Sequence, residues 1–209
     1  MKKERNSLKS IVYQKTLDGI ISGEYKAGQI LNEQELVEKF GFSKSPVREA
    51  LISLCNEGVL RSIPRYGYEV IRLTSRDVED ILRYRLILEQ GLLREGGQNM
   101  TEEYFTELEQ LNAFCNASEN DMWIHWEHNT NFHLALVSCS RNQYAITQLK
   151  KSMDILKRAY AQFYWDKWND HFDPFDMKYH QDIIACLKNG DIEGASEKLE
   201  LDFKDFHSL

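Results

Sequence analysis

The 209-residue sequence has few helix breakers and no long apolar run. Only three residues are proline, and Pro174 is the only one after residue 74, so long helices are expected through the second part of the chain. No stretch approaches the ~18 apolar residues of a membrane-spanning helix. The charged start, Met1 to Asn6, is not followed by the apolar segment of an export signal. These absences predict a cytoplasmic protein with no membrane segment.

Cysteine pairs and catalytic motifs are also missing. Cys55, Cys115, Cys139 and Cys186 have no CxxC spacing and lie inside predicted elements, so reduced thiols are expected. The sequence contains no glycine-rich phosphate loop, no Ser/His/Asp or Cys/His nucleophile pattern and no internal repeat. An enzyme is therefore not expected.

A short amphipathic helix is predicted over residues 42–54. Its apolar residues recur at three- and four-residue spacing, whereas Lys44, Ser45 and Arg48 lie off that stripe near the start of the helix. A proline suits the first turn, and Ser43 or Ser45 can cap the helix. These residues alone fit an ordinary surface helix as well as a DNA-recognition helix.

The neighbouring segments favour the recognition helix. Residues 32–40 are a second short predicted helix, joined to the first by a glycine-containing turn, as in a helix-turn-helix. Residues 59–63 and 68–72 are predicted to be the two strands of a hairpin. An amphipathic helix that ends near Gly23 adds a third helix. The sequence predicts a winged helix-turn-helix of three helices and a β-hairpin wing.

Several short motifs in this segment point to a known family. They are Ile20 to Gly23, Gly28 to Leu31, Glu35-Leu36, Phe40-Gly41, Ser43 to Leu51, Glu57-Gly58 and Gly67. With them, residues 8–73 resemble the DNA-binding domain of the GntR family of bacterial transcription regulators. The resemblance implies DNA contacts by Gln34, Ser43, Lys44, Ser45, Arg48, Arg65, Tyr66 and Gly67. Many members have Arg in place of Gln34 and Lys44, and Lys cannot form the forked contact with guanine that Arg forms.

Charge divides the chain at the end of this segment. Through residue 74 there are 12 Lys and Arg against 9 Asp and Glu, a net charge of +3, and the remainder has 14 against 24, a net charge of −10. Phosphate contact depends on where positive charge lies rather than on its sum. Because the chain is also longer than the ~100–150 residues of one typical domain, we predict two domains, residues 1–74 and 75–209.

Residues 75–209 are predicted to form an all-α bundle of six helices. Apolar residues recur at helical spacing between breaks near residues 96–99, 117–120, 138–142, 169–174 and 189–191. The motifs here are Arg85 to Glu89, Asn129 to His133, Ser140 to Asn142, His180 and Gly190-Asp191. They resemble the FCD effector-binding domain of the FadR-like branch of the family, and six helices match its VanR-like subgroup.

Four polar side chains of this bundle are expected to point inward. Asn129 and His133 lie four residues apart on one apolar helix face, His180 follows the spacing of its apolar neighbours, and Asp202 lies among apolar residues. Burying them costs free energy unless they pair with each other, water, a ligand or a metal. A hydrogen-bonded core histidine explains either histidine alone. Convergence of two histidines and a carboxylate from three helices favours a site.

The family resemblance implies a divalent metal at this site. Many FCD domains bind one through an Asp, the His four residues later, a His on a later helix and a last His. Here Asn129 occupies the Asp position, His133 and His180 match, and Asp202 replaces the last His, with His207 as its alternative. The set suits one Zn, Ni, Mn or Fe ion per subunit, with Asn129 as a weak or outer ligand. A metal-free site is the equal alternative.

The resemblance implies a ligand-responsive transcription regulator that is cytoplasmic and homodimeric, binds double-stranded operator DNA, and acts as a repressor. Its effector would be a small carboxylate clamped by Arg85, although an interhelical or dimer-face salt bridge explains Arg85 equally well. The alternatives are a direct metal sensor and a metal-dependent enzyme with an accessory DNA-binding domain. The enzyme is disfavoured because no general acid or base accompanies the site.

Overall fold

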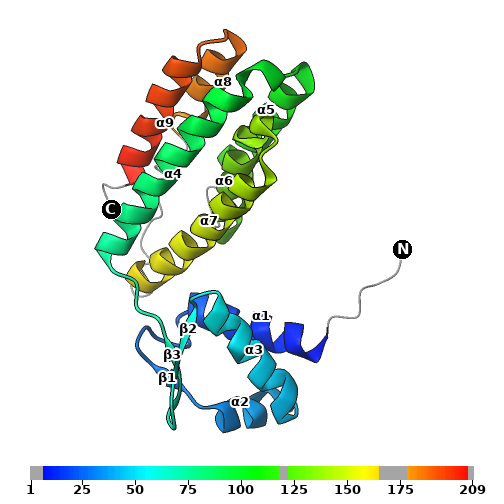
Figure 1. Cartoon of the computed structure of the whole chain (residues 1–209), viewed down its shortest axis with the longest axis vertical. Helices are drawn as coiled ribbons and strands as arrows, with labels where there is room; N and C mark the ends of the chain where they lie inside the picture. The colour runs from blue at the N-terminus through cyan, green and yellow to red at the C-terminus, as the bar shows by residue number, and fades with distance from the viewer. Residues whose placement is uncertain (1–6, 118–121, 165–177, 207–209) are drawn as a thin grey trace. The chain divides into compact units, whose positions relative to one another are not determined.

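The computed structural model describes residues 7–117, 122–164 and 178–206 (Figure 1). The chain divides into two compact units, one formed by residues 1–74 with 157–167 and the other by the remaining residues. None of the described helices combines the length and the apolar character that a membrane span requires. Each unit is described separately below.

The first unit contains the three predicted short helices. They are α1 (Leu8–Ile21), α2 (Glu33–Phe40) and α3 (Lys44–Asn56), and both α1 and α2 pack against α3. The side chain of Asn32 caps α2 by accepting a hydrogen bond from a backbone N–H of its first turn. Gly41 ends α2 with a φ of 69°, a left-handed conformation that favours glycine, and so turns the chain into α3.

One apolar core holds this unit together. The stripe predicted for α3 is confirmed, because Val47, Ala50, Leu51 and Leu54 are completely buried. They pack with apolar side chains of α1 and of the sheet. Since these residues occupy one side of α3, the other side of the helix faces solvent.

The wing belongs to a three-stranded antiparallel sheet. The predicted hairpin is formed by β2 (Leu60–Ile63) and β3 (Gly67–Val70), and β1 (Ile30–Leu31) pairs with the other edge of β3, giving the order β1-β3-β2. Strand β1 is not predictable from the sequence, because two residues are too few to show alternation.

The second unit is helical throughout its described residues. Its α-helices are α4 (Ser75–Gly96), α5 (Glu102–Ala117), α6 (Met122–Leu136), α7 (Gln143–Tyr164, whose end from Lys157 groups with the first unit), α8 (His180–Lys188) and α9 (Ile192–Phe206). Short 3-10 turns η1 (Gly97–Asn99) and η2 (Ser138–Ser140) follow α4 and α6. The predicted fold class, a winged helix followed by an all-α bundle, is confirmed, and the VanR-like subgroup stays a prediction.

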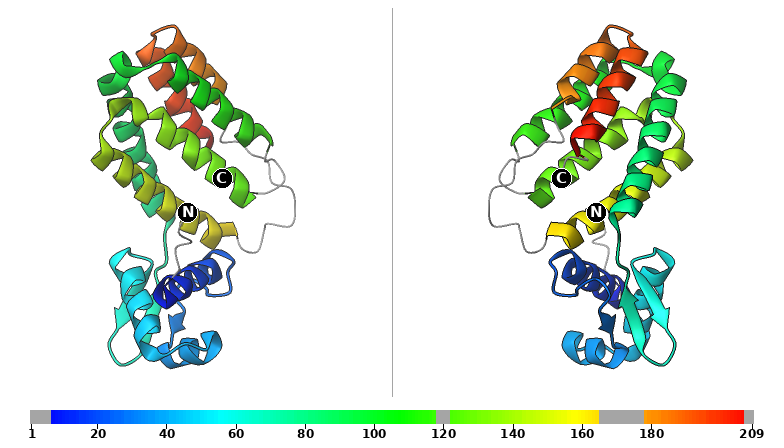
Figure 2. Two further views of the ribbon diagram at one scale, coloured as in Figure 1. Left: turned by 90° about the vertical axis from the view of Figure 1, so that its right-hand side faces the viewer. Right: turned by 90° about the vertical axis from the view of Figure 1, so that its left-hand side faces the viewer.

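Helix pairs in this unit bring together residues far apart in sequence. α5 lies beside α6, α8 beside α9, and α9 also packs on α4 (Figures 1 and 2). Gly190, with a φ of 72°, and Asp191, whose carboxylate accepts the N–H of Gly194 at 2.8 Å, form the tight turn between α8 and α9. The predicted break at residues 169–174 lies outside the described residues, as does most of the break at 117–120.

Candidate functional site

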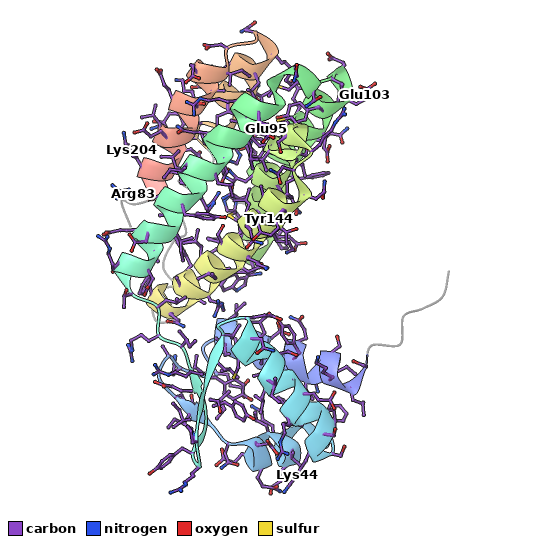
Figure 3. The ribbon with its side chains drawn as sticks, viewed as in Figure 1. Lys44, Arg83, Glu95, Glu103, Tyr144 and Lys204 are labelled. Carbon is purple, nitrogen blue, oxygen red and sulfur yellow. The ribbon has the colours of Figure 1, made fainter. Side chains whose placement is uncertain are left out.

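The first candidate site is the exposed side of α3. Ser43 is the residue before the helix, and Lys44, Ser45 and Arg48 follow within its first two turns, all of them exposed. Lys44 projects from the N-terminal end of the helix (Figure 3). Hydroxyl, ammonium and guanidinium groups on one side of a helix suit contacts with phosphates and base edges.

Two of these side chains, and that of Gln34 in α2, already have partners within the unit. The Ser45 hydroxyl donates to Glu49 Oε1 at 2.8 Å, and Ser43 forms no side-chain cap, so the predicted cap of α3 by either serine is wrong. Arg48 donates from Nε and Nη2 to the two carboxylate oxygens of Glu33 in α2, at 2.9 and 2.8 Å. These hydrogen bonds raise the pKa of Arg48. On α2, the Gln34 amide donates to Glu38 Oε1 at 3.0 Å.

The wing residues predicted to contact DNA lie at the turn between β2 and β3. Arg65 has a φ of 71°, and the Tyr66 side chain is 70% exposed. Gly67 has a φ of 136°, and a Cβ at this position would overlap the carbonyl oxygen of Leu31 in β1. Gly67 is therefore needed for the close approach of two strands, whereas Arg65 and Tyr66 present side chains to solvent.

The second candidate site lies in the core of the helical unit. His133 of α6, His180 of α8 and Asp202 of α9 each offer one ligand atom, and these three atoms lie within 4.8 Å of one another. Asp202 Oδ2 is 3.7 Å from His133 Nε2 and 4.0 Å from His180 Nε2. Asn129, one turn before His133, is also buried. The alternative ligand His207 lies outside the described residues.

A fourth helix, α4, orients His133. One oxygen of the Glu89 carboxylate lies 2.7 Å from His133 Nδ1, and the other accepts a hydrogen bond from Arg85 Nε at 3.0 Å. Because an ionised carboxylate only accepts, Nδ1 carries a proton. In the neutral ring that metal ligation requires, the lone pair of His133 is then on Nε2, the atom that faces Asp202. Burial opposes ionisation of Glu89, but Arg85 and His133 outweigh it and lower the pKa of this carboxyl.

His180 is held in the neutral form. Its ring stacks on Phe132, with centroids 3.7 Å apart, and both side chains are completely buried. Burial, together with nearby His133, His125 and Arg85, lowers its pKa well below the usual value. Neither ring nitrogen has a hydrogen-bond partner among the described residues. A buried polar atom in this state calls for a ligand, a metal or water.

Arg85 has a free donor in the same region. Its guanidinium is buried against the ring of Phe203, 4.5 Å from the centroid, and its ion pair with Glu89 lies within α4 rather than between helices. Nη2 has no hydrogen-bond partner in the described part of the chain. Leaving a buried charged donor unsatisfied is costly, so Nη2 is suited to an acceptor that arrives with a ligand.

The residues present fit a divalent transition metal. Two imidazoles and one carboxylate are the nitrogen and oxygen donors that such ions prefer, and a carboxylate behind a ligating histidine is their usual support. Metal bonds of ~2.1 Å place neighbouring ligand atoms roughly 3–3.5 Å apart, so small side-chain shifts complete the set. Three protein ligands leave a coordination position for a further ligand.

Sequence reasoning missed two buried groups near this site. Glu89 follows Arg85 by four residues on the buried stripe of α4, and His125 precedes Asn129 by four residues on α6, where it is 1% exposed. Both carry the signal that identified His133, a polar residue at the spacing of an apolar face. The sequence therefore carries a signal for both residues.

Comparison with known proteins finds a matching family for each part of the chain. Residues 8–70 match the family described as bacterial regulatory proteins, gntR family, and residues 80–203 match the FCD domain. The uncharacterized HTH-type transcriptional regulator YdhC of Bacillus subtilis (strain 168) is 30% identical over 183 residues, covering 85% of this chain and 80% of that protein. The HTH-type transcriptional repressor RspR of Escherichia coli (strain K12) is 30% identical over 171 residues, covering 78% and 72%.

A solved structure shares the fold. E. coli McbR/YncC has a TM-score of 0.75 and 24% identity, over 95% of this chain and 94% of that chain. The FCD match alone spans more than half of the sequence. The chain therefore belongs to the GntR family of DNA-binding bacterial transcription regulators, with an FCD domain after its winged helix, and is not an enzyme.

Proposed function

We propose that this chain is a cytoplasmic, homodimeric repressor whose operator binding is controlled by a small carboxylate held in the helical unit together with a divalent metal. The observation that carries the proposal is the buried set of His133, His180 and Asp202, with the free donor of Arg85 in the same core. RspR is named a repressor, which supports repression. The Glc operon transcriptional activator of E. coli, 29% identical over 177 residues, represents the opposite mode.

Charge explains why metal and carboxylate would bind together. Arg85 and Glu89 neutralise each other, and with both imidazoles neutral, as metal ligation requires, Asp202 leaves the core with one negative charge. That charge repels an anion. A divalent ion reverses the sign to one positive charge, which a single carboxylate group balances. Arg85 Nη2 then offers that carboxylate a charge-assisted hydrogen bond.

In the first unit, we infer that the start of α3 enters the major groove of a two-fold operator and that the wing contacts the backbone or minor groove. The contacting residues would be Ser43, Lys44, Ser45 and Arg48, with Gln34 beside them and Arg65, Tyr66 and Gly67 in the wing. All of them except Gly67 are exposed, and this exposure and the basic charge of this part of the chain support the assignment.

Arg48→Ala tests whether α3 contacts the bases of the operator. Duplexes selected from a randomised library with the full-length protein supply the operator probe, and fluorescence anisotropy measures its affinity. The variant should lose selective binding while its thermal unfolding is unchanged, because Arg48 is exposed. Arg94→Ala is the matched control, since Arg94 forms a similar exposed fork with Glu193, at 2.8 and 2.7 Å, in the other unit. Unchanged affinity of Arg48→Ala would contradict the assignment.

Metal content tests the second site. Protein purified without chelator should contain one divalent ion per subunit, and Asp202→Ala should lose it, whereas Asp182→Ala, an exposed carboxylate on α8, should keep it. Absence of any ion would favour an organic ligand held by Arg85 and the histidines. If the ion alone changes operator affinity, with no carboxylate added, the direct metal sensor is the better description.

A further inference from the structure

The fork between Arg48 and Glu33 joins the recognition helix to the first residue of α2. The Arg48 side chain is 59% exposed, whereas the Glu33 side chain is 19% exposed. Glu33 follows the cap residue Asn32 at a helix N-terminus, where negative charge is favoured. The less exposed carboxylate of α2 therefore fixes the direction of the more exposed guanidinium of α3.

A third element approaches this pair. The pKa of Tyr68 in β3 is raised by burial and next by the negative charge of Glu33, and the positive charge of Arg48 opposes this rise. A side chain of the sheet therefore senses both charges of the fork.

The fork leaves part of the guanidinium available to another acceptor. A guanidinium has five N–H groups, and Glu33 accepts from Nε and from one N–H of Nη2. Three N–H groups remain. Two of them, one on each terminal nitrogen, point side by side away from Nε, and two parallel donors match O6 and N7 of guanine in the major groove.

The fork also decides what kind of acceptor is favoured. A guanidinium paired with a carboxylate is nearly neutral at a distance, so its attraction to phosphate falls, while its remaining donors keep their direction. Lys44 is exposed and forms no ion pair with any described residue, so no carboxylate of the described chain offsets its attraction to phosphate. Exposed ion pairs add little stability, so the main consequence of the fork is the position of Arg48.

We propose that Glu33 determines operator specificity by holding the terminal fork of Arg48 toward a guanine, while Lys44 binds phosphate. This inference rests on the proposed DNA contact by Arg48. Glu33 is a positioning residue, because its effect passes through Arg48 rather than through a contact of its own with DNA.

The test compares affinities of the full-length protein for the selected duplex, its single-base-pair variants and a scrambled duplex, at one salt concentration. Glu33→Gln keeps the size of the side chain and removes its charge. It should weaken binding to the selected duplex about tenfold, with the loss concentrated at one G·C pair per half-site, and leave binding to the scrambled duplex unchanged or tighter.

Two further variants show whether the effect comes from the position of Arg48 or only from the loss of one negative charge. Glu69→Gln is the control for charge, because it removes the carboxylate of another ion pair in the first unit. Glu69 in β3 lies 2.6 Å from Arg61 Nη2 in β2. This variant should keep the wild-type ratio of selected to scrambled affinity. Glu33→Asp keeps the charge but shortens the reach, so it should lose part of the ratio. Thermal unfolding of each variant confirms that the proteins compared are folded.

The outcomes distinguish failure of this inference from failure of the proposed function. In an Arg48→Ala background, Glu33→Gln should change neither the affinity ratio nor the base profile. Equal weakening on both duplexes, or the same loss with Arg48 absent, overturns the role of Glu33. If Arg48→Ala abolishes selective binding but Glu33→Gln keeps the wild-type ratio, only that role fails. If Arg48→Ala has no effect, the proposed contact fails as well.

Discussion

Glu89 shapes the chemistry of the core site through two neighbours. Its oxygens lie between Arg85 and His133, and it is completely buried. The contact with Nδ1 fixes the tautomer of His133, so that the lone pair on Nε2 is directed toward Asp202. A carboxylate behind a ligating histidine also raises its basicity, which strengthens metal binding.

The single substitution Glu89→Gln should lower the affinity for a divalent metal about 10–100-fold. The amide can donate as well as accept, so it no longer holds His133 in the tautomer that has its lone pair on Nε2. Isothermal titration or competition with a chelator measures the affinity. Glu95→Gln changes an exposed carboxylate of the same helix and is the control (Figure 3). Equal affinity of Glu89→Gln and wild type would show that Glu89 does not support the site.

The role of a residue was predictable where the sequence of its own helix carried the signal. His133, His180 and Asp202 were identified because each stands on an apolar face of its own helix, and all three are buried. Glu33 gave no such signal. Its side chain is only partly buried, and its role depends on Arg48, fifteen residues later on another helix.

Among the elements, the small strand β1 explains the glycine at the start of β3. Ile30 pairs with Glu69 and Leu31 with Tyr68, which brings the Leu31 carbonyl against Gly67. The sheet therefore depends on a position without a side chain and with a φ that other residues rarely adopt.

Gly67→Ala should lower the stability of the first unit by about 1–3 kcal/mol through its backbone conformation, and further through overlap with Leu31. Gly41→Ala is the matched comparison, because Gly41 also has a positive φ but nothing lies within 4 Å of its added Cβ. Thermal unfolding followed by circular dichroism should give a larger fall in melting temperature for Gly67→Ala. Equal falls would show that the overlap is relieved at no cost.

The whole molecule combines a basic DNA-binding domain with an acidic helical domain. A basic first segment carries the side chains proposed to contact DNA, and an acidic helical unit buries polar groups around a candidate metal site. If a carboxylate bound in the second unit changes operator affinity, operator DNA must change carboxylate affinity by the same factor.

Metal removal tests this linkage. Chelator-treated protein should bind the selected duplex but no longer respond to a panel of small monocarboxylates. Metal-loaded protein should respond, with a change in operator affinity of about 5–150-fold, because the ion supplies the positive charge that the anion needs. Titrating the same acid with and without duplex checks the reciprocal effect. A response that is equal with and without metal would remove the ion from the mechanism.

The sequence by itself determined the order and type of the main elements, the family, and which side chains of each helix face inward. These features are local, because helical periodicity, turn residues and motifs are written within short segments. Only the tertiary structure decided which of the inward groups meet. His133, His180 and Asp202 come from three helices and Glu89 from a fourth, and periodicity does not say which helix faces pack together. The ion pair between Arg48 and Glu33 was not predictable for the same reason, because its partners lie on two helices. The strand β1 was not predictable because it is only two residues long and is defined by its pairing with β3.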